Sequence, residues 1–363
     1  MADWCVILGS NHHNSYGVIR SLHKANIKAI VYIVSETEKC FYRKSCFLDK
    51  IFFVKDTAEL LRQLKASNYK NIPLIACTDK FAAFIDENFN ELHNYFILPG
   101  CPEQGSLRKI MKKWDMSALA SENGLNIPHT HILPIPLTEE MLREQQFPVI
   151  IKPLDSIIGG KNDIRICFSK RDLLDYSESC THEQVIIQEF INKEYEFQLI
   201  GVSLDYGDKI ILPAITKLIR ASSNKTNTGT VKVVNISETK LDLNPILSFI
   251  KATKYQGLFS VEFLHAPDGK DYFMEINFRN DGNCICMLAA GINLPQIWCN
   301  QDLTEEFSIR ATTTMPFFPM FKRTVKHPQE IVPFIRDLFN QRCLMDISLK
   351  DPTSFLRRLK LLK

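Results

Sequence analysis

The chain has 363 residues, of which 45% are hydrophobic and 23% charged, and its 44 Lys and Arg nearly balance its 41 Asp and Glu. At roughly 100–200 residues per domain, this length predicts two or three domains. The apolar fraction excludes a disordered or fibrous protein, and a net charge of +3 gives no indication of nucleic-acid binding. No apolar run reaches the roughly 18 residues that cross a bilayer, and the N-terminus is unlike a signal peptide. We therefore expect a soluble cytoplasmic protein without nucleic-acid partners or a transmembrane segment.

Eleven cysteines are present, and their positions argue against disulfides and zinc. The number is odd, and Cys5, Cys77 and Cys167 lie within apolar runs, where a small hydrophobic residue serves. Only Cys284 and Cys286 are close together, and one C-x-C pair lacks zinc-finger spacing. We expect reduced thiols.

The first 110 residues alternate short apolar runs with helical segments, which is typical of a parallel α/β sheet. The expected strands are 5–9, 29–34, 51–54, 73–77 and 95–98. The polar loop after the first strand lacks G-x-G-x-x-G, so a dinucleotide fingerprint is absent. Its two histidines, His12 and His13, could be ligands, but adjacent loop histidines are more often solvated.

Later segments differ in character. Pro99 to Gly105 mark a boundary, a helix is expected over 107–123, and strands over 148–152, 163–168 and 184–188 follow. The last sixty residues mix proline, aromatic and basic side chains, and the basic end favours a solvated helix face, with contact to an anionic surface as the alternative. The predicted parts are 1–110, 111–188, 189–305 and a C-terminal extension, 306–363.

The most specific pattern lies between residues 257 and 279, where two strand-like runs flank Asp268-Gly269. This dipeptide predicts a two-residue hairpin turn of type I′, which needs positive φ at both central positions. The turn places Glu262 directly opposite Glu275. Alternation along the second strand predicts two faces, with Glu275, Asn277 and Arg279 on one and Met274, Ile276 and Phe278 on the other.

Two carboxylates opposite each other destabilise a sheet unless something neutralises them. Glu262, Glu275 and Asn277 together supply hard oxygen donors, which suit Mg²⁺ completed by water and substrate phosphates, with Mn²⁺ as an alternative ion. The pattern also allows an exposed sheet face with paired charges. A glycosidase carboxylate pair is conceivable too, but it would leave Asn277 and Arg279 without a role.

A lysine and a glycine loop point in the same direction. Lys152 ends a run that otherwise reads as buried strand, where an ammonium group needs an anion beside it. The following loop holds Gly159 and Gly160, whose backbone N–H groups could close over phosphates, although no Walker motif is present. A Gly-Gly loop alone is usually a turn. Combined with Lys152 and a magnesium site, it indicates a nucleoside triphosphate.

A second acidic pair follows. An apolar strand ends at Gln188-Glu189, and Glu196 recurs seven residues later. An adenine could lie against the apolar chain while a carboxylate accepts hydrogen bonds from the ribose hydroxyls. A solvated strand end with scattered glutamates accounts for this segment alone about equally well.

Together these motifs resemble the ATP-grasp superfamily of carboxylate–amine ligases, over the first 300 or so residues. The resemblance implies an α/β protein, α+β in its catalytic part, with an N-terminal parallel-sheet domain, a small lid and a C-terminal mixed-sheet catalytic domain. Within the superfamily, the region of Asp79 and the segment 351–355 look most like the D-aspartate-ligase-like, amino-acid-ligase branch.

The resemblance also implies roles for individual residues. ATP would be bound by Lys152, Gly159, Gly160, Gln188, Glu189, Phe190, Ile191 and Glu196, the last through the ribose. Mg²⁺ would be held by Glu262, Glu275 and Asn277, and Arg279 would contact the transferred phosphoryl group or the acyl phosphate. Lys217 and Arg220 are candidates for phosphate or substrate carboxylate, with a plain surface role as the alternative.

Three departures from the family pattern stand out. The usual lysine on the helix before the lid falls near Met116, so that Lys112 or Lys113 substitutes or one phosphate contact is lost. The lid loop has fewer glycines than is usual, and Phe278 replaces a proline between Asn277 and Arg279.

The implied reaction is phosphoryl transfer from ATP to a substrate carboxylate, followed by attack of an amine on the acyl phosphate, with the lid excluding water. The expected substrates are small molecules, such as an amino acid, and a homodimer is a candidate assembly. Two alternatives remain: a different acceptor, as in purine biosynthesis or carboxylation, and an ATP-binding protein without catalysis.

Overall fold

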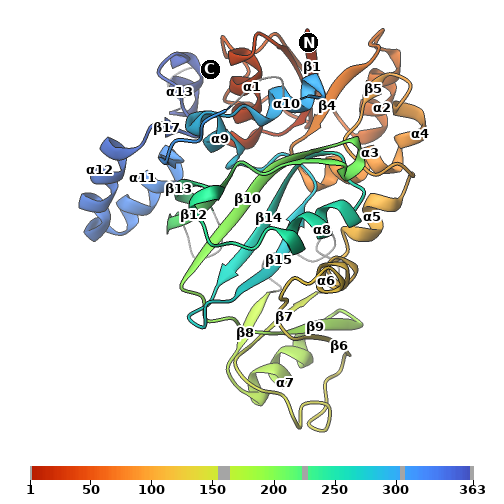
Figure 1. Ribbon diagram of the computed structural model, residues 1–363, viewed down its shortest axis with the longest axis vertical. Coiled ribbons are helices and arrows are strands. Elements are labelled where there is room, and N and C mark those ends of the chain that lie inside the picture. The colour runs from red at the N-terminus through yellow and green to blue at the C-terminus, as the bar shows by residue number, and fades with distance from the viewer. Residues whose placement is uncertain (1, 154–163, 223–227, 303–306, 360–363) are drawn as a thin grey trace.

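The computed structural model describes residues 2–153, 164–222, 228–302 and 307–359. Within these ranges the strands form three sheets, which lie at the N-terminal end, in the centre and in a small peripheral unit (Figure 1). The two glycines expected to cover phosphates, Gly159 and Gly160, lie outside the described residues.

The N-terminal sheet is parallel, with the strand order β3-β2-β1-β4-β5. Its strands are β1 (Trp4–Gly9), β2 (Lys28–Val34), β3 (Lys50–Val54), β4 (Ile72–Ala76) and β5 (Phe96–Ile97), with α1 (His13–Lys24), α2 (Thr57–Ala66), α3 (Asp79–Glu87) and α4 (Phe89–Leu92) between them. Both faces are covered, because Cys5 and Ile7 of β1 enter one hydrophobic core while Val6 and Leu8 enter another. The expected parallel α/β sheet is confirmed.

The lid is a four-stranded antiparallel sheet of order β6-β9-β7-β8, at the bottom of Figure 1. Its elements are β6 (Thr130–Pro134), β7 (Val149–Pro153), β8 (Arg165–Cys167), α7 (Lys170–Ser179) and β9 (Gln184–Glu189). A capping box between Ser169 and Asp172 starts α7, and Leu173 of that helix packs on Val149 and Val185 of the sheet.

The helix expected over 107–123 is two helices, α5 (Ser106–Ile110) and α6 (Lys113–Glu122). The break lies at Lys112, whose backbone is extended and precedes the first turn of α6. The single long helix was therefore a wrong prediction. The break separates Lys112 from Lys113, so that only the second of the two lysines belongs to α6.

The central sheet has eight strands in the order β15-β14-β10-β12-β13-β16-β17, with β11 beside β10. It is antiparallel except for the pair β16–β17. The strands are β10 (Tyr195–Leu204), β11 (Lys209–Ile211), β12 (Ala214–Ala221), β13 (Gly229–Asn235), β14 (Gly257–His265), β15 (Asp271–Asn277), β16 (Thr312–Met315) and β17 (Cys343–Leu344). Residues 306–363 thus add two strands to this sheet.

Two helices, α9 (Cys284–Ala290) and α10 (Leu294–Asn300), tie the N-terminal and central sheets together. The other helices of this part of the chain are α8 (Asn244–Ala252), α11 (Phe317–Lys326), α12 (Ile331–Asn340) and α13 (Pro352–Arg358). Trp298 of α10 is fully buried and donates a hydrogen bond from its indole N–H to the carbonyl of Leu74 at 3.0 Å. The shared cores fix the carboxyl edge of the N-terminal sheet against the central sheet.

The hairpin of β14 and β15 has the expected pairing at Glu262 and Glu275 but a different turn. Ala266 N–H donates to the carbonyl of Lys270, so the loop has three residues, and only its last, Gly269, has positive φ (82°). A three-residue loop alone would pair Glu262 with Met274, but β15 bulges at Met274 and restores the pairing with Glu275. The two-residue turn was therefore wrong, and the bulge corrects the register.

Two further expectations are corrected. Arg358, in the basic C-terminal segment, is not solvated: its guanidinium lies between the rings of Phe41 and Phe318 and pairs with buried Asp346 at 3.4 Å. His13 is buried, because it lies at the start of α1 against Gly282, where an added Cβ would come within 2.8 Å of the imidazole.

All eleven cysteines are free thiols, and burial raises the pKa of several of them, Cys77 to about 12. Within the described residues, no helix combines the length and the apolar character that a membrane span requires.

Candidate functional site

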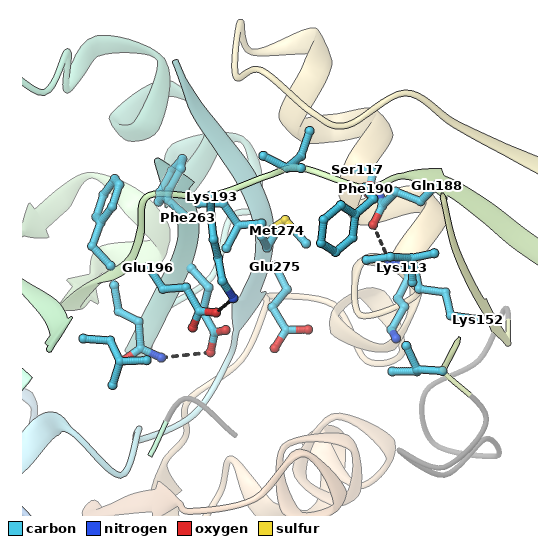
Figure 2. A pocket seen from close by; sticks show the side chains of 18 of the residues that line it. Lys113, Ser117, Lys152, Gln188, Phe190, Lys193, Glu196, Phe263, Met274 and Glu275 are labelled. Carbon is cyan, nitrogen blue, oxygen red and sulfur yellow. Dashed lines mark hydrogen bonds and ion pairs between the residues drawn. The ribbon is translucent and has the colours of Figure 1, made fainter. Parts of the chain in front are cut away.

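A cleft of about 320 Å³ lies between the lid sheet and the central sheet. Figure 2 shows side chains from both sheets and from α6 pointing into it. Eight of the residues selected from the sequence line this cleft: Lys152, Gln188, Glu189, Phe190, Ile191, Glu196, Glu262 and Glu275. Residues that are up to 123 positions apart in the chain are thus brought to one cleft.

The cationic end of the cleft is built by Lys152 at the end of β7. Its ammonium donates to the side-chain oxygen of Gln188 at 2.9 Å, and Gln188 in turn donates to Thr130 at 2.9 Å. Burial and the neighbouring charge of Lys113 lower the pKa of Lys152 to about 8. An anionic ligand would stabilise the protonated form and raise this pKa again, which is the behaviour expected of a phosphate-binding lysine.

The chain between the two sheets, Glu189 to Ile191, forms one wall of the cleft. The backbone N–H groups of Glu189 and Phe190 are used within the lid, by the carbonyls of His129 and Pro148. Among the described residues, no acceptor takes the N–H of Ile191, which leaves that donor for a ligand. The ring of Phe190 and the side chain of Met274 stand close together in Figure 2 and give this wall an apolar surface.

Glu196, near the start of β10, presents a carboxylate at the next position along the cleft. One oxygen pairs with the ammonium of Lys193. The other oxygen, Oε2, is buried and has no hydrogen-bond partner among the described residues. A buried carboxylate oxygen without a donor is costly, so this position fits a ligand that carries a hydroxyl group.

Glu262 and Glu275 lie directly opposite each other on β14 and β15. Burial raises the pKa of Glu262 to about 8, and the charges of Glu275 and Asp281 add to the effect. Gln198 opposes the shift by donating to Glu262 Oε1 at 2.9 Å. A cation between the two carboxylates would remove the repulsion that raises this pKa.

The donor set fits a hard divalent cation that takes further ligands from a substrate. Among the described residues, no group of three or more His, Cys, Asp or Glu side chains gathers around a point, so the protein offers only the carboxylate pair and an amide. The amide of Asn277 turns its nitrogen towards Glu262 (3.2 Å) and its oxygen towards Arg279. As a metal ligand, Asn277 would present the opposite side of its amide, and this role stays a prediction.

Arg279 lies just beyond the hairpin of β14 and β15, outside the lining of the cleft. Its guanidinium donates to Asp79 at 2.8 Å and to Asn277 at 2.9 Å, and lies 3.6 Å from Asp281. Asp79 begins α3, directly after β4 of the N-terminal sheet. Arg279 therefore connects two parts of the protein. One is the edge of the parallel sheet at the C-terminal ends of its strands, where α/β folds bind ligands, and the other is the β14–β15 hairpin that carries Glu262 and Glu275.

Lys217 and Arg220 are not brought to the cleft. Lys217 lies on the face of β12 opposite to Thr216 and Leu218, which do line the cleft, and its ammonium sits 3.3 Å from the centre of the Tyr195 ring. Arg220 pairs with Asp337 of α12 at 2.6 Å. Arg220 is therefore neither at the cleft nor on the plain surface that was kept open as the alternative, because its side chain is only 16% exposed in this ion pair.

Sequence reasoning missed several residues that line the cleft: Lys193, Gln198, Met274 and Asn283. Alternation from Glu196 could have found Gln198, which shares its face of β10. Met274 was placed on the opposite face because alternation cannot foresee a bulge. Of the two lysines offered for the family position near Met116, Lys113 lines the cleft, while Met116 is buried and accepts a hydrogen bond from Ile276 N–H.

The comparisons with known proteins agree with this geometry, although no family model matches the chain. The D-aspartate ligase of Enterococcus faecium (strain Aus0004) is 23% identical over 317 residues, covering 80% of this chain and 74% of that protein. A formate-dependent phosphoribosylglycinamide formyltransferase of Prochlorococcus marinus (strain MIT 9312) is 27% identical over 165 residues, covering 43% and 40%.

Solved structures share the fold at low identity. The L-amino acid ligase from Bacillus licheniformis superposes with a TM-score of 0.62 at 15% identity, over 83% of this chain and 73% of that one. The N5-carboxyaminoimidazole synthetase from Staphylococcus aureus gives 0.69 at 14% identity, over 92% and 86%. The expected parallel-sheet domain, small lid and mixed central sheet are all present, and this chain has the ATP-grasp fold that these solved structures share.

Proposed function

We propose that this protein is an ATP-dependent, ADP-forming ligase that activates a substrate carboxylate as an acyl phosphate and joins it to an amine. The observation that carries the proposal is the cleft itself, in which Lys152, the Glu196 carboxylate and the Glu262–Glu275 pair line one continuous cavity. Figure 2 shows Glu275 between Glu196 and Lys152, which fits a nucleoside triphosphate with its ribose at Glu196 and its phosphates and metal between Glu275 and Lys152.

The nucleotide would lie with its base between the lid and the central sheet. The apolar wall at Phe190 and Met274 accepts the faces of an adenine, and the N–H of Ile191 supplies a donor to its edge. The unpartnered Oε2 of Glu196 would accept from a ribose hydroxyl. Lys152 and Lys113 would then neutralise the phosphates, and Gly159 and Gly160 of the lid are proposed to close over them.

Mg²⁺, or Mn²⁺, would be held by Glu262 and Glu275, with Asn277 as the proposed third ligand, and would neutralise charge on the phosphates. Gln198 holds Glu262 in place through its side-chain amide, which is itself fixed by a hydrogen bond from Asn283 at 2.8 Å. Glu262 is therefore positioned before a ligand enters.

Arg279 is the proposed catalytic residue. A carboxylate substrate at the edge of the N-terminal sheet would attack the γ-phosphorus, ADP would leave, and an amine would then displace phosphate from the acyl phosphate. The guanidinium would stabilise negative charge on the transferred phosphoryl oxygens. Its hydrogen bonds to Asp79 and Asn277 hold the guanidinium between the edge of the N-terminal sheet and the β14–β15 hairpin.

The substrates we propose are an amino acid or a molecule containing one, in a cytoplasmic enzyme with access to ATP. The names of two similar proteins, a D-aspartate ligase and an L-amino acid ligase, support this choice. A second candidate acceptor, of the purine-biosynthesis type, is supported by the similarity to N5-carboxyaminoimidazole synthetase. We retain a homodimer as the candidate assembly, since one neighbour is described as a dimer.

The test is phosphate release from ATP and Mg²⁺ across pairs of amino acids, with mass spectrometry of the product. Aminoimidazole ribonucleotide and bicarbonate form a separate arm that tests the second candidate. Stimulation by one amino-acid pair, with formation of the matching amide, supports the proposal. ATP binding without acceptor-stimulated release across the whole panel contradicts it.

A further inference from the structure

The two helices α11 and α12 form a hairpin at the periphery of the molecule, at the left edge of Figure 1. A short 3₁₀ turn, Pro328–Glu330, connects them, and one side of the pair packs on the body through Met320, Phe334 and Met315. Each helix is ten residues long and strongly amphipathic. The hairpin is therefore anchored on one side only.

The outer side of this hairpin is apolar. Val325 of α11 is 64% exposed, and Val332 and Phe339 of α12 are 76% and 83% exposed. The full set of exposed apolar residues, which we call the hairpin stripe, consists of Phe321, Val325, Ile331, Val332, Ile335 and Phe339. At 100° per residue, the four members on α12 fall within one 100° sector, and the two on α11 within 40°. The stripe is thus a continuous side of each helix rather than scattered residues.

The charge beside the stripe is of one sign. Residues 317–342 contain two acidic residues, and both are used internally: Glu330 pairs with Arg323 at 2.5 Å, and Asp337 is buried and pairs with Arg220 at 2.6 Å. The remaining basic residues are exposed and are Lys322, Lys326, Arg336 and Arg342. Of these, Arg336 lies 3.9 Å from the second oxygen of Asp337, at 68% side-chain exposure.

We propose that the hairpin stripe and its basic border dock on an anionic phospholipid surface. An apolar helix face bordered by Lys and Arg is the pattern of helices that lie in a membrane interface. Viewed along each helix axis, the basic residues lie on the side of the helix next to the stripe. They are Lys322 and Lys326 on α11 and Arg336 on α12. The apolar side chains can then enter the acyl region while the cations reach the headgroups.

Charge complementarity favours this occupant over a second copy of the chain. A two-fold interface places the same patch on both subunits, so the basic border of one copy would face that of the other. No acidic side chain of the hairpin is free to offset this repulsion. An anionic membrane supplies the opposite charge along the whole border. The proposal is independent of the ligase activity and is tested without it.

The experiment is co-sedimentation of the full chain with vesicles of phosphatidylcholine alone or mixed equally with phosphatidylglycerol. We expect at least tenfold tighter binding to the mixed vesicles at low salt, with a large loss at 0.5 M salt. The double variant Val332→Glu with Phe339→Glu should weaken this binding at least tenfold. Lys322→Glu with Lys326→Glu should weaken it at least fivefold, and because both lysines are solvent-exposed this second pair does not threaten folding.

The control is Phe168→Glu, which adds one negative charge, half of that added by Val332→Glu with Phe339→Glu, at a side chain that is 70% exposed in the lid and should change binding less than twofold. Circular dichroism and thermal melting confirm that each variant is folded. Equal binding to both vesicle types, or unchanged binding by either double variant, overturns the proposal. So does light scattering that shows a dimer dissociated by Val332→Glu with Phe339→Glu while vesicle binding is absent, because the stripe would then be a subunit interface.

Discussion

Glu262 and Glu275 face each other across β14 and β15, and the pKa of Glu262 is raised to about 8 because both carboxylates stand in a largely buried cleft. The amides of Gln198 and Asn277 donate to Glu262, and the charge of Arg279 opposes the rise in its pKa, yet the pKa remains raised. The destabilisation is concentrated where the proposed metal binds, so the function and the stability of the hairpin are opposed.

Replacing one carboxylate separates these two effects. Glu275→Gln should lower ATP-dependent phosphate release roughly 100-fold or more, because a metal ligand is lost. The same change should raise the free energy of unfolding of the metal-free protein by about 1 kcal/mol, the equivalent of one pKa unit. Asp268→Asn, in the turn of the same hairpin, is the matched control. Normal phosphate release by Glu275→Gln would refute the metal assignment.

Glu262 and Lys152 should contribute to the pH dependence of stability in the ligand-free protein with opposite signs. The folded protein holds a proton on Glu262 that the unfolded chain releases, so the contribution of this group to stability falls as pH rises from about 4.5 to 8. The pKa of Lys152 is lowered to about 8, so the unfolded chain binds more protons at this group between pH 8 and 10.5, and the contribution of Lys152 rises there.

Thermal melting between pH 5 and 10 measures each contribution as the difference between a variant and wild type. The difference for Glu262→Gln should change between pH 5 and 8, and the difference for Lys152→Met between pH 8 and 10. Both changes keep the size of the side chain, so their overall packing cost is small. A difference between Glu262→Gln and wild type that stays constant from pH 5 to 8 would contradict the raised pKa of Glu262.

Recognition of the ribose is predicted to depend on Glu196. Glu196→Gln should raise the KM for ATP roughly tenfold, since a charged hydrogen-bond acceptor is removed from a buried position. Wild type should discriminate against 2′,3′-dideoxy-ATP, and the variant should lose most of that discrimination. Glu194→Gln, the same change at an exposed neighbour, is the control. Unchanged discrimination in Glu196→Gln would place the ribose elsewhere.

The sequence was informative where a chemical conflict had to be resolved. The opposed glutamates and the lysine at the end of a buried strand were identified because each is costly without a ligand, and both line the cleft. Charge alone was a poor guide, since Lys217 interacts with Tyr195 on the far face of β12 and Arg358 is enclosed by aromatic rings.

The features that could not be predicted depend on contacts between distant segments. The bulge at Met274 brings two consecutive side chains, Met274 and Glu275, into the cleft, which strict alternation forbids. His13 was expected in solvent, but Gly282, which is 269 positions away in the chain, packs against it. Local propensity contains no information about such packing.

The choice between Lys112 and Lys113 gives a paired test on consecutive residues. Lys113 lines the cleft from the first turn of α6 and its charge lowers the pKa of Lys152, whereas Lys112 lies outside the helix and the cleft lining. Lys113→Met should therefore raise the KM for ATP roughly tenfold, by removing one charge from the phosphate end. Lys112→Met should change it less than twofold.

A second readout links this effect to Lys152. Without the charge of Lys113, the pKa of Lys152 should rise, and the alkaline side of the stability curve should shift to higher pH in Lys113→Met but not in Lys112→Met. If both variants behave alike in nucleotide affinity and in pH dependence, α6 does not supply the phosphate-binding lysine, and the position occupied by buried Met116 has no functional replacement.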